Sequence, residues 1–317
     1  MIIKTYFILF IIIVNFAATN AQEMEIWKAK KILDIQAKLG EGALWEPQKE
    51  VLLWVDIEGR KLMIFNPEKG TNEVIDVEER IGTVVPVDQK RALLALQNGI
   101  FYLDYVTGSR TLIVNPLDTI ENIRFNDGKC DPAGRFWVGT MKLKGPPKQA
   151  ALYCLYNEHD VSIVEQGITI SNGLVWSNNK KTMFYIDTPV RKVAAYDYDH
   201  QTGKISNKRF VIEVDKAIGA PDGMAIDEEG MLWIALWGGE AVGRFDPNTG
   251  EMIGKVEVPG AKNITSCAFG GKDLNQLYIT SASVGMKDEE KEIFPDAGSL
   301  FMVQTGIKGM KANYFKP

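Results

Sequence analysis

Short apolar runs recur along the chain at a nearly constant spacing, each preceded by turn-forming or charged residues. Six of them have strand character: KEVLLWVD (49–56), KRALLAL (90–96), GRFWVG (134–139), KTMFYID (181–187), GMLWIA (230–235) and NQLYIT (275–280). Their central large residues are 40, 43, 48, 48 and 45 residues apart when aligned on Trp54, Leu94, Trp137, Tyr185, Trp233 and Tyr278. Repeats of about 40–50 residues with several strands each are typical of β-propeller blades.

Each of these runs lies within a longer unit of strands. One short apolar run precedes it, and further strand-like runs follow, most of them ending in an Asp, Asn or Gly turn of the hairpin type. We therefore predict an all-β fold, a six-bladed β-propeller with four-stranded blades. Residues 27–37 lie outside the six units and are expected to complete the last blade and close the ring. An array of two-sheet sandwiches is the alternative, and the charged stretch 286–294 is interpreted as a loop excursion.

The N-terminal residues have the pattern of a targeting segment. Lys4 is followed by an apolar run over 6–14 and then by small residues at 19–21, which predicts a signal peptide over residues 1–21. Residues 22–317 are then expected to form a single propeller domain in an exported protein, either periplasmic or secreted. The apolar run is shorter than the roughly 20 residues of a membrane span, and an uncleaved anchor is the alternative.

The composition excludes several classes of function. The formal net charge is −5 and no basic run occurs, which argues against a nucleic-acid partner. Three widely spaced cysteines argue against a disulfide-built scaffold, although one bridge stays open. The only histidines, His159 and His200, stand among turn residues, which disfavours a Ser-His-Asp triad or a histidine-rich zinc site. After signal cleavage we expect a monomer that has no membrane partner.

One small motif returns at distant points of the chain. In GEG, NDG, SNG and PDG an oxygen-bearing side chain precedes a glycine at the start of a unit's first strand, giving Glu41, Asp127, Asn172 and Asp222. The first strand of a propeller blade lines the central channel, so these four side chains are expected to converge at one mouth. The glycine removes a side chain where the strands crowd toward the axis.

Three carboxylates and one amide oxygen make a hard ligand set. Such oxygens suit one divalent cation, Ca²⁺ first, with Mg²⁺, Mn²⁺ and Zn²⁺ as further candidates. A cation would also relieve the repulsion between buried like charges. The alternative is that the Asp-Gly and Asn-Gly pairs are ordinary surface turns. Their common position within the repeat favours a site.

Longer stretches around these motifs resemble a known family. LGEGALWEP, RFNDGKCDPAGRFWVGTM, ISNGLVWSNNKKTMFYID, APDGMAIDEEGMLWIALWGG and TSCAFGGKDLNQLYITSA are similar to the gluconolactonase, regucalcin and luciferin-regenerating-enzyme family over about 39–281. The resemblance implies a six-bladed propeller with one divalent cation at the channel mouth and hydrolysis of sugar lactones.

The resemblance also implies roles for individual residues. Matched by motif, Glu41, Asn172 and Asp222 are expected to bind the metal, and Arg124 and Asn126 to bind the substrate. The resemblance makes Asp127 a neighbour of the metal or its water, on the substrate side, rather than a direct ligand.

One segment departs from the family pattern. After GTM the family often carries acidic residues, whereas this chain has Lys142 and Lys144. Lys144 is expected to bind the substrate and to favour a lactone that carries a carboxylate; a solvated lysine loop is the alternative. Trp237, which stands before two glycines, is a candidate to flank a sugar ring.

The expected reaction is opening of a cyclic ester. The cation would polarise the lactone carbonyl, and Asp222 would take the proton of the attacking water, with Asp127 as the alternative base. A metal-dependent phosphotriester or phosphoester hydrolase would use the same geometry. A non-catalytic secreted calcium-binding propeller is a further alternative. Arg124 and Asn126 favour the enzyme, because a structural metal needs no substrate-type donors.

Overall fold

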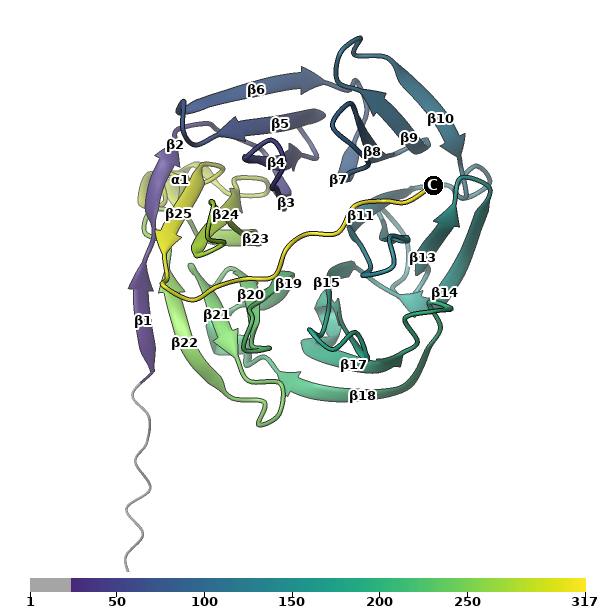
Figure 1. Cartoon of the computed structure of the whole chain (residues 1–317). Helices are drawn as coiled ribbons and strands as arrows, with labels where there is room; N and C mark the ends of the chain where they lie inside the picture. The colour runs from purple at the N-terminus through teal and green to yellow at the C-terminus, as the bar shows by residue number, and fades with distance from the viewer. Residues whose placement is uncertain (1–23) are drawn as a thin grey trace, which may run out of the picture.

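The fold is a ring of six antiparallel sheets around a central channel, in a computed structural model that describes residues 24–317 (Figure 1). The prediction of a six-bladed propeller with four-stranded blades is confirmed. The first three blades, each given from the channel outward, are β3 (Gly40–Glu46), β4 (Val51–Asp56), β5 (Lys61–Asn66) and β6 (Thr71–Asp76); β7 (Ile81–Pro86), β8 (Arg91–Leu96), β9 (Gly99–Asp104) and β10 (Arg110–Val114); and β11 (Ile123–Cys130), β12 (Phe136–Lys142), β13 (Ala150–Asn157) and β14 (Asp160–Ile168).

The other three blades follow the same order. They are β15 (Ser171–Trp176), β16 (Thr182–Asp187), β17 (Lys192–Tyr198) and β18 (Ile205–Glu213); β19 (Ala220–Ile226), β20 (Leu232–Trp237), β21 (Ala241–Phe245) and β22 (Met252–Glu257); and β23 (Asn263–Gly270), β24 (Gln276–Ala282), β25 (Leu300–Gln304) and β2 (Lys30–Leu33). The short helices η1 (Thr188–Val190), η2 (Lys216–Ile218) and α1 (Asp288–Ile293) lie in connections. The charged stretch 286–294 is thus a loop excursion, as expected, and it contains α1.

The ring is closed by the N-terminal segment. Strand β2 pairs antiparallel with β25, with Lys30 opposite Met302 and Lys31 opposite Phe301, so the last blade takes its outer strand from the start of the chain. This confirms the prediction that residues 27–37 complete the last blade. Strand β1 (Glu25–Lys28) adds a fifth strand to the neighbouring blade, parallel to β22.

The core lies between the blades and is built mainly by the second strand of each. The six residues aligned in the sequence repeat all lie on these strands and are at most 1% exposed: Trp54, Leu94, Trp137, Tyr185, Trp233 and Tyr278. Large rings fill the space between adjacent blades, as Trp137 against Trp176 at 5.7 Å and Trp233 against Phe269 at 5.3 Å between ring centroids. These tryptophans therefore pack the interfaces between blades.

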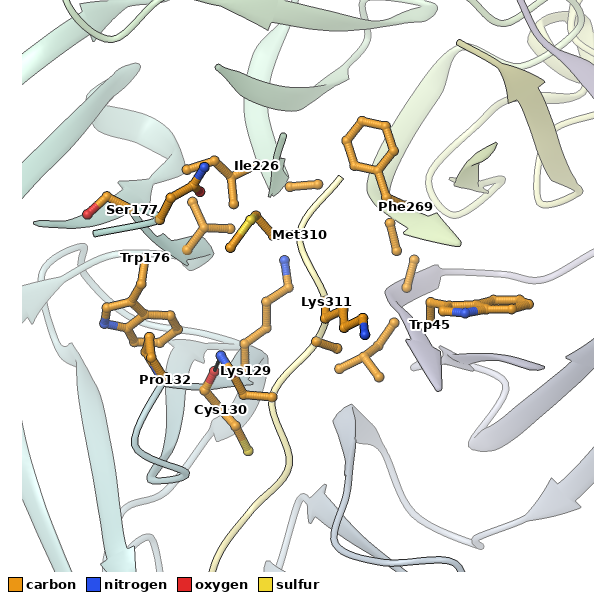
Figure 2. Close-up of a pocket in the computed structure, with 18 of the residues that line it drawn as sticks. Trp45, Lys129, Cys130, Pro132, Trp176, Ser177, Ile226, Phe269, Met310 and Lys311 are labelled. Carbon is orange, nitrogen blue, oxygen red and sulfur yellow. Dashed lines mark hydrogen bonds between the residues drawn. The ribbon is translucent and has the colours of Figure 1, made fainter. Parts of the chain in front are cut away.

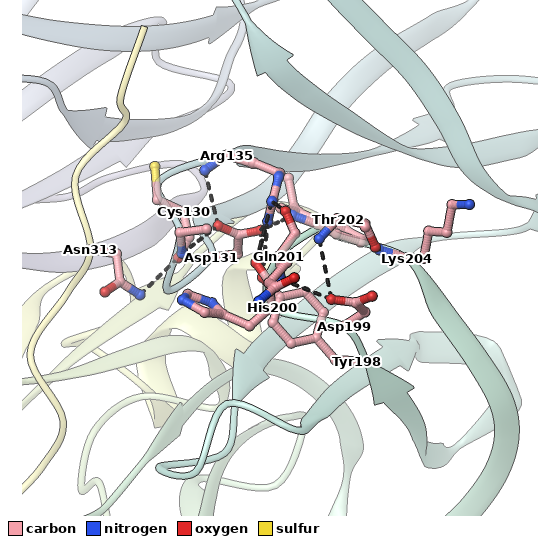
Figure 3. A network of polar contacts seen from close by, with 12 residues as sticks. Cys130, Asp131, Arg135, Tyr198, Asp199, His200, Gln201, Thr202, Lys204 and Asn313 are labelled. Atoms are coloured by element: carbon pink, nitrogen blue, oxygen red, sulfur yellow. Dashed lines mark hydrogen bonds and ion pairs between the residues drawn. The ribbon is translucent and has the colours of Figure 1, made fainter.

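A buried carboxylate ties blade 3 to blade 4 (Figure 3). Asp131, fully buried after β11, accepts from Trp137 Nε1 at 3.1 Å, Tyr198 OH at 2.7 Å and Arg135 Nη1 at 3.0 Å. Arg135 Nη1 also donates to the carbonyl of His200 at 3.2 Å, across to the outer hairpin of blade 4. The loop histidine is therefore part of a structural contact.

Asp227 makes the same kind of carboxylate contact in blade 5. It accepts from Trp233 Nε1 and Arg244 Nε, each at 2.9 Å. The same carboxylate-to-indole contact therefore holds the second strand to the first in two blades.

Two further expectations concern the cysteines and the N-terminus. Cys130, Cys154 and Cys267 are free thiols and all are buried, so the described chain uses them for packing. The expected signal peptide, residues 1–21, lies outside the described residues. Within residues 24–317 no helix is long and apolar enough to cross a membrane.

Candidate active site at one mouth of the channel

Four of the six inner strands carry the candidate site residues, at or beside a backbone irregularity that all six strands share. Strands β3, β7, β11, β15, β19 and β23 line the channel (Figure 1), and each has a bulge in its pairing with the second strand of its blade. Bulges turn side chains away from the regular alternation of a strand. Glu41 and Asn172 immediately precede a bulge, whereas Asn126, Asp127 and Asp222 lie within one.

Glycines beside these residues let neighbouring inner strands approach closely. A Cβ on Gly173 would lie 2.7 Å from the Asp222 carbonyl oxygen, and one on Gly223 would lie 2.8 Å from the Thr265 carbonyl oxygen. Real Cβ atoms are essentially never this close, so β15, β19 and β23 pack together only because these positions lack a side chain. The expected reason for glycine is confirmed for Gly128, Gly173 and Gly223, whereas Gly42 has no atom nearer than 3.4 Å to its Cβ position and is favoured by its positive φ of 60°.

The structure brings six of the predicted residues together at one end of the channel. All six are 3–5% exposed: Glu41, Arg124, Asn126, Asp127, Asn172 and Asp222. Lys144, the seventh, is different. It is exposed in the loop after β12, and Lys142 in the same loop donates to the Glu121 carbonyl at 2.7 Å instead of reaching the channel. Because Lys142 pairs with Ile123 at the start of β11, this loop lies at the same mouth.

The carboxylates of this mouth are buried with few partners. Glu41 Oε2 accepts only from Gly42 N at 3.0 Å, and Asp127 Oδ1 accepts from Gly128 N at 2.8 Å. Asp127 Oδ2 and Asp222 Oδ1 are buried and have no hydrogen-bond partner. Unpaired buried acceptors cost free energy, so in a native structure they point to a ligand that supplies the missing contact.

Electrostatics points in the same direction. Burial, together with the neighbouring charges of Asp222 and Asp127, raises the pKa of Glu41 well above its ordinary value. Burial and the charge of Asp127 do the same to the pKa of Asp222. Burial also lowers the pKa of Arg124 to about 10. In all three residues the pKa shift shows that burial disfavours the charged form more than the neighbouring groups stabilise it.

A hydrogen-bond chain fixes the orientation of Asn172. Thr188 Oγ1 donates to the Pro221 carbonyl at 2.9 Å, so it must accept from Asn172 Nδ2, at 2.8 Å. The amide oxygen of Asn172 therefore faces the opposite way, where Asn126 Nδ2 donates to it at 2.9 Å. A second lone pair on that oxygen stays available.

Both N–H groups and one oxygen lone pair of Asn126 are used by its neighbours. Its Oδ1 accepts from Arg124 Nη1 at 2.6 Å, and its Nδ2 donates to the Ser171 carbonyl at 2.7 Å as well as to Asn172. Asn126 thus positions Asn172 and Arg124, whereas the buried Nε of Arg124 has no partner and is free to donate. Thr188 was missed by sequence reasoning, since no motif marks it and only its contacts with blades 4 and 5 reveal its part.

The donor set fits a divalent cation. Glu41 and Asp222 supply carboxylate oxygens and Asn172 supplies an oriented amide oxygen, the hard ligands that Ca²⁺ and Mg²⁺ prefer. Across residues 24–317 no group of three or more His, Cys, Asp or Glu side chains is close enough together to hold a metal ion. The wider set with three carboxylates is therefore not assembled, which leaves Asp127 beside the three oxygen donors.

Comparison with known proteins shows the family to which this chain belongs. Residues 39–283 match the SMP-30/gluconolactonase/LRE-like region, so the chain belongs to that family, in which relatives are named as lactonases. It is 41% identical over 276 residues to the Bacillus subtilis (strain 168) protein named "Putative sugar lactone lactonase YvrE", covering 87% of this chain and 94% of that one.

Two solved structures share the fold closely. The luciferin-regenerating enzyme has a TM-score of 0.85 and 33% identity, covering 91% of this chain and 99% of its own. The calcium-binding protein regucalcin from Agrobacterium tumefaciens has a TM-score of 0.88 and 27% identity, covering 92% and 99%. The family resemblance noted in the sequence is therefore confirmed.

Proposed function

We propose that this protein hydrolyses a sugar lactone at the mouth formed by Glu41, Asn172 and Asp222, with one divalent cation held by these three residues. The observation that carries the proposal is Asp222 Oδ1, a buried carboxylate oxygen without a partner in a mouth that also holds the buried carboxylate of Glu41. Relatives named as lactonases support the substrate class.

Each side chain has a part in the proposed reaction. When bound, the cation supplies Lewis-acid polarisation of the lactone carbonyl. Asp222 accepts the proton of the attacking water through an unpaired oxygen, and Asp127 Oδ2 accepts from a substrate hydroxyl or from that water. Arg124 donates from Nε to a substrate oxygen, while Asn126 keeps Arg124 and Asn172 in place.

Lys144 adds a proposal about the substrate. Its exposed position at the same mouth suits a lactone that carries a carboxylate. If so, Lys144→Glu lowers turnover of acidic lactones relative to neutral ones. An unchanged ratio would remove this part of the proposal and leave the rest in place.

The test of the main proposal is proton release from a panel of lactones that includes gluconolactone. The purified protein is assayed after chelation and again with Ca²⁺, Mg²⁺, Mn²⁺ or Zn²⁺ restored. We expect metal-dependent turnover, lost in Glu41→Gln and Asp222→Ala and kept in Glu251→Gln, a control at an exposed position just before β22. Turnover that survives chelation would contradict the proposed role of the cation.

A non-catalytic calcium-binding role is the second candidate. The structure of regucalcin from Agrobacterium tumefaciens, which is described as calcium-binding, favours it. Calorimetric binding of Ca²⁺ that depends on Glu41 and Asp222, together with no turnover of any lactone, would identify this role.

A further inference from the structure

A second cavity lies at the other end of the channel, away from the carboxylates. Its volume is about 150 Å³, and it is lined by the last residues of five inner strands, among them Trp45 on β3, Trp176 on β15 and Ile226 on β19 (Figure 2). The candidate active site uses the first residues of the same strands. From Asp222 to Ile226 is four residues, or about 13 Å along a strand. The two sites come nearest on β11, where Lys129 follows Asp127 by two residues, about 7 Å along the strand, and interacts with its charge.

The C-terminal segment forms the roof of this cavity. Figure 1 shows it crossing the channel from blade 6 toward blade 3, and Met310 and Lys311 line the cavity from above (Figure 2). The segment is anchored on both sides of the crossing. Met310 N donates to the Ile226 carbonyl at 3.2 Å, and Phe315, which is 1% exposed, donates its N–H to the Pro86 carbonyl at 2.9 Å. The cavity is therefore a built and covered space.

Lys129 supplies a cation inside this space. It comes from β11, is half-buried, and its side chain reaches toward Met310 (Figure 2). Its Nζ donates to the Met224 carbonyl, and within residues 24–317 it has no carboxylate partner within 4.0 Å. An ammonium group has three donors, so two remain for a ligand. Asp127, two residues earlier on β11, interacts with this charge without a hydrogen bond, and the two remaining donors are available to the cavity that Lys129 lines.

The walls define the rest of the ligand. Met310, Ile226 and Ala312 contribute to a mostly apolar surface around the ammonium group. A cavity of about 150 Å³ is large enough to hold benzene. Lys180 and Lys311 are exposed at the rim and add positive potential, which attracts anions.

We propose that this cavity binds a small organic carboxylate with an apolar body of about the size of a benzene ring. The carboxylate pairs with Lys129, and the apolar part lies against Met310 and the apolar ends of the inner strands, such as Ile226. Such a charge-assisted hydrogen bond in an apolar pocket is strong enough to discriminate between an acid and its neutral isostere. The proposal concerns binding alone and does not depend on lactone turnover.

The test compares benzoate with benzamide, which has the same ring and no charge. Binding is measured by calorimetry and by quenching of tryptophan fluorescence at fixed ionic strength. We expect benzoate to bind at least about tenfold more tightly than benzamide. Lys129→Met, which keeps the length of the side chain, should abolish this preference. Lys180→Met, which removes a charge only at the rim, should keep it.

Two more variants control for misfolding of the Lys129 variant and for benzoate binding at the other mouth. Ala268→Leu leaves Lys129 in place but fills part of the cavity, so it should lose benzoate binding even if the Lys129 variant does not fold. Asp222→Asn should bind benzoate like the unmodified protein, because Asp222 lies at the other mouth. Equal binding of benzoate and benzamide, no binding up to about 10 mM, or loss of binding in Asp222→Asn would each overturn the proposal.

Discussion

At the scale of single residues, the candidate active site depends on the direction in which one amide points. Thr188 commits its hydroxyl hydrogen to the Pro221 carbonyl, so Asn172 can offer it only Nδ2. The Asn172 oxygen then faces Asn126. Ligand-orienting partners of this kind typically change metal affinity by about 10–100-fold when they are removed.

We therefore predict that Thr188→Val weakens binding of the proposed cation by about tenfold, because Asn172 loses the acceptor that fixes its amide. Calorimetric titration of the chelated protein with Ca²⁺ measures the change. Thr188→Ser keeps a hydroxyl and should restore most of the affinity. Unchanged affinity in Thr188→Val would show that Asn172 needs no orientation from this side.

Substituting Asp222 is expected to stabilise the fold, although it removes the proposed activity. Burial and the charge of Asp127 raise the pKa of Asp222 in the folded protein. A raised pKa means that ionised Asp222 opposes folding at neutral pH, above its unfolded pKa, in the absence of a cation. Asp222→Asn should therefore raise the melting temperature of the chelated protein by about 2–4 °C per kcal/mol gained.

Asp56 is the matched control for that measurement. It is also buried, but it accepts from the backbone N–H groups of Lys38, Leu39 and Gly59 at 2.9–3.0 Å. Asp56→Asn should lower the melting temperature, because the amide replaces an oxygen that already has its partners. A lower melting temperature for Asp222→Asn as well would argue that Asp222 is a structural residue.

At the scale of elements, the bulged inner strand is the unit that makes the site. Each inner strand gives up regular pairing at one point, and in β3, β11, β15 and β19 a polar side chain of the candidate site stands there. Glycine next to the bulge allows the neighbouring strand to come close, as Gly173 does for β19. Packing of β15 on β19 sets the separation of Asn172 and Asp222.

Gly173→Ala should accordingly damage the site and the fold together. The added methyl group would meet the Asp222 carbonyl oxygen and Met224 Cβ, each at 2.7 Å. We expect a loss of about 1–3 kcal/mol in the free energy of unfolding, measured in urea. Weaker Ca²⁺ binding should accompany it. Gly70→Ala, at an open turn, is the control and should leave Ca²⁺ binding unchanged.

The network around Asp131 acts between elements of two blades (Figure 3). Asp131 and Arg135 form a buried ion pair at 3.0 Å, so removing the carboxylate leaves the guanidinium, the Trp137 indole and the Tyr198 hydroxyl without this acceptor. We predict that Asp131→Ala costs about 3–5 kcal/mol of stability. Asp199→Ala, at an exposed turn in the same region, should cost much less. Equal losses in urea unfolding would show that the network adds little.

At the scale of the whole molecule, closure of the ring depends on β2, an N-terminal strand that completes the last blade. Strand β2 completes blade 6 and joins residues that are about 270 apart in sequence, such as Lys31 and Phe301. A blade that ends with an open edge would expose unpaired backbone groups and the apolar face of β25. Closure therefore makes blades 1 and 6 neighbours.

Truncation tests this closure. Relative to a chain beginning at residue 24, removal of residues up to 34 deletes β1 and β2 and should lower the melting temperature by about 10 °C or more, because backbone pairing with β25 and the burial of Leu33 are lost. Removal up to residue 28 deletes only β1 and should cost less. Similar losses in both would mean that β2 does not hold the ring closed.

The sequence determined the repeat and therefore the fold. Large residues such as Trp54, Trp137 and Trp233 recur because every blade buries the same position of its second strand, so spacing alone indicates six equivalent sheets. The polar motifs before the glycines fall on the inner strands for the same reason. Convergence of Glu41, Asn172 and Asp222 follows from ring geometry once the repeat is recognised.

Only the tertiary structure decided which atoms are free. Contacts between strands and blades use both N–H groups of Asn126, orient Asn172 through Thr188 and leave one oxygen of Asp222 unpaired. No local sequence pattern encodes these contacts. The cavity beside Lys129 exists only because the C-terminal segment crosses the channel after six blades have closed. Periodicity is a property of each unit by itself, whereas hydrogen-bond satisfaction and cavities are properties of units packed against one another.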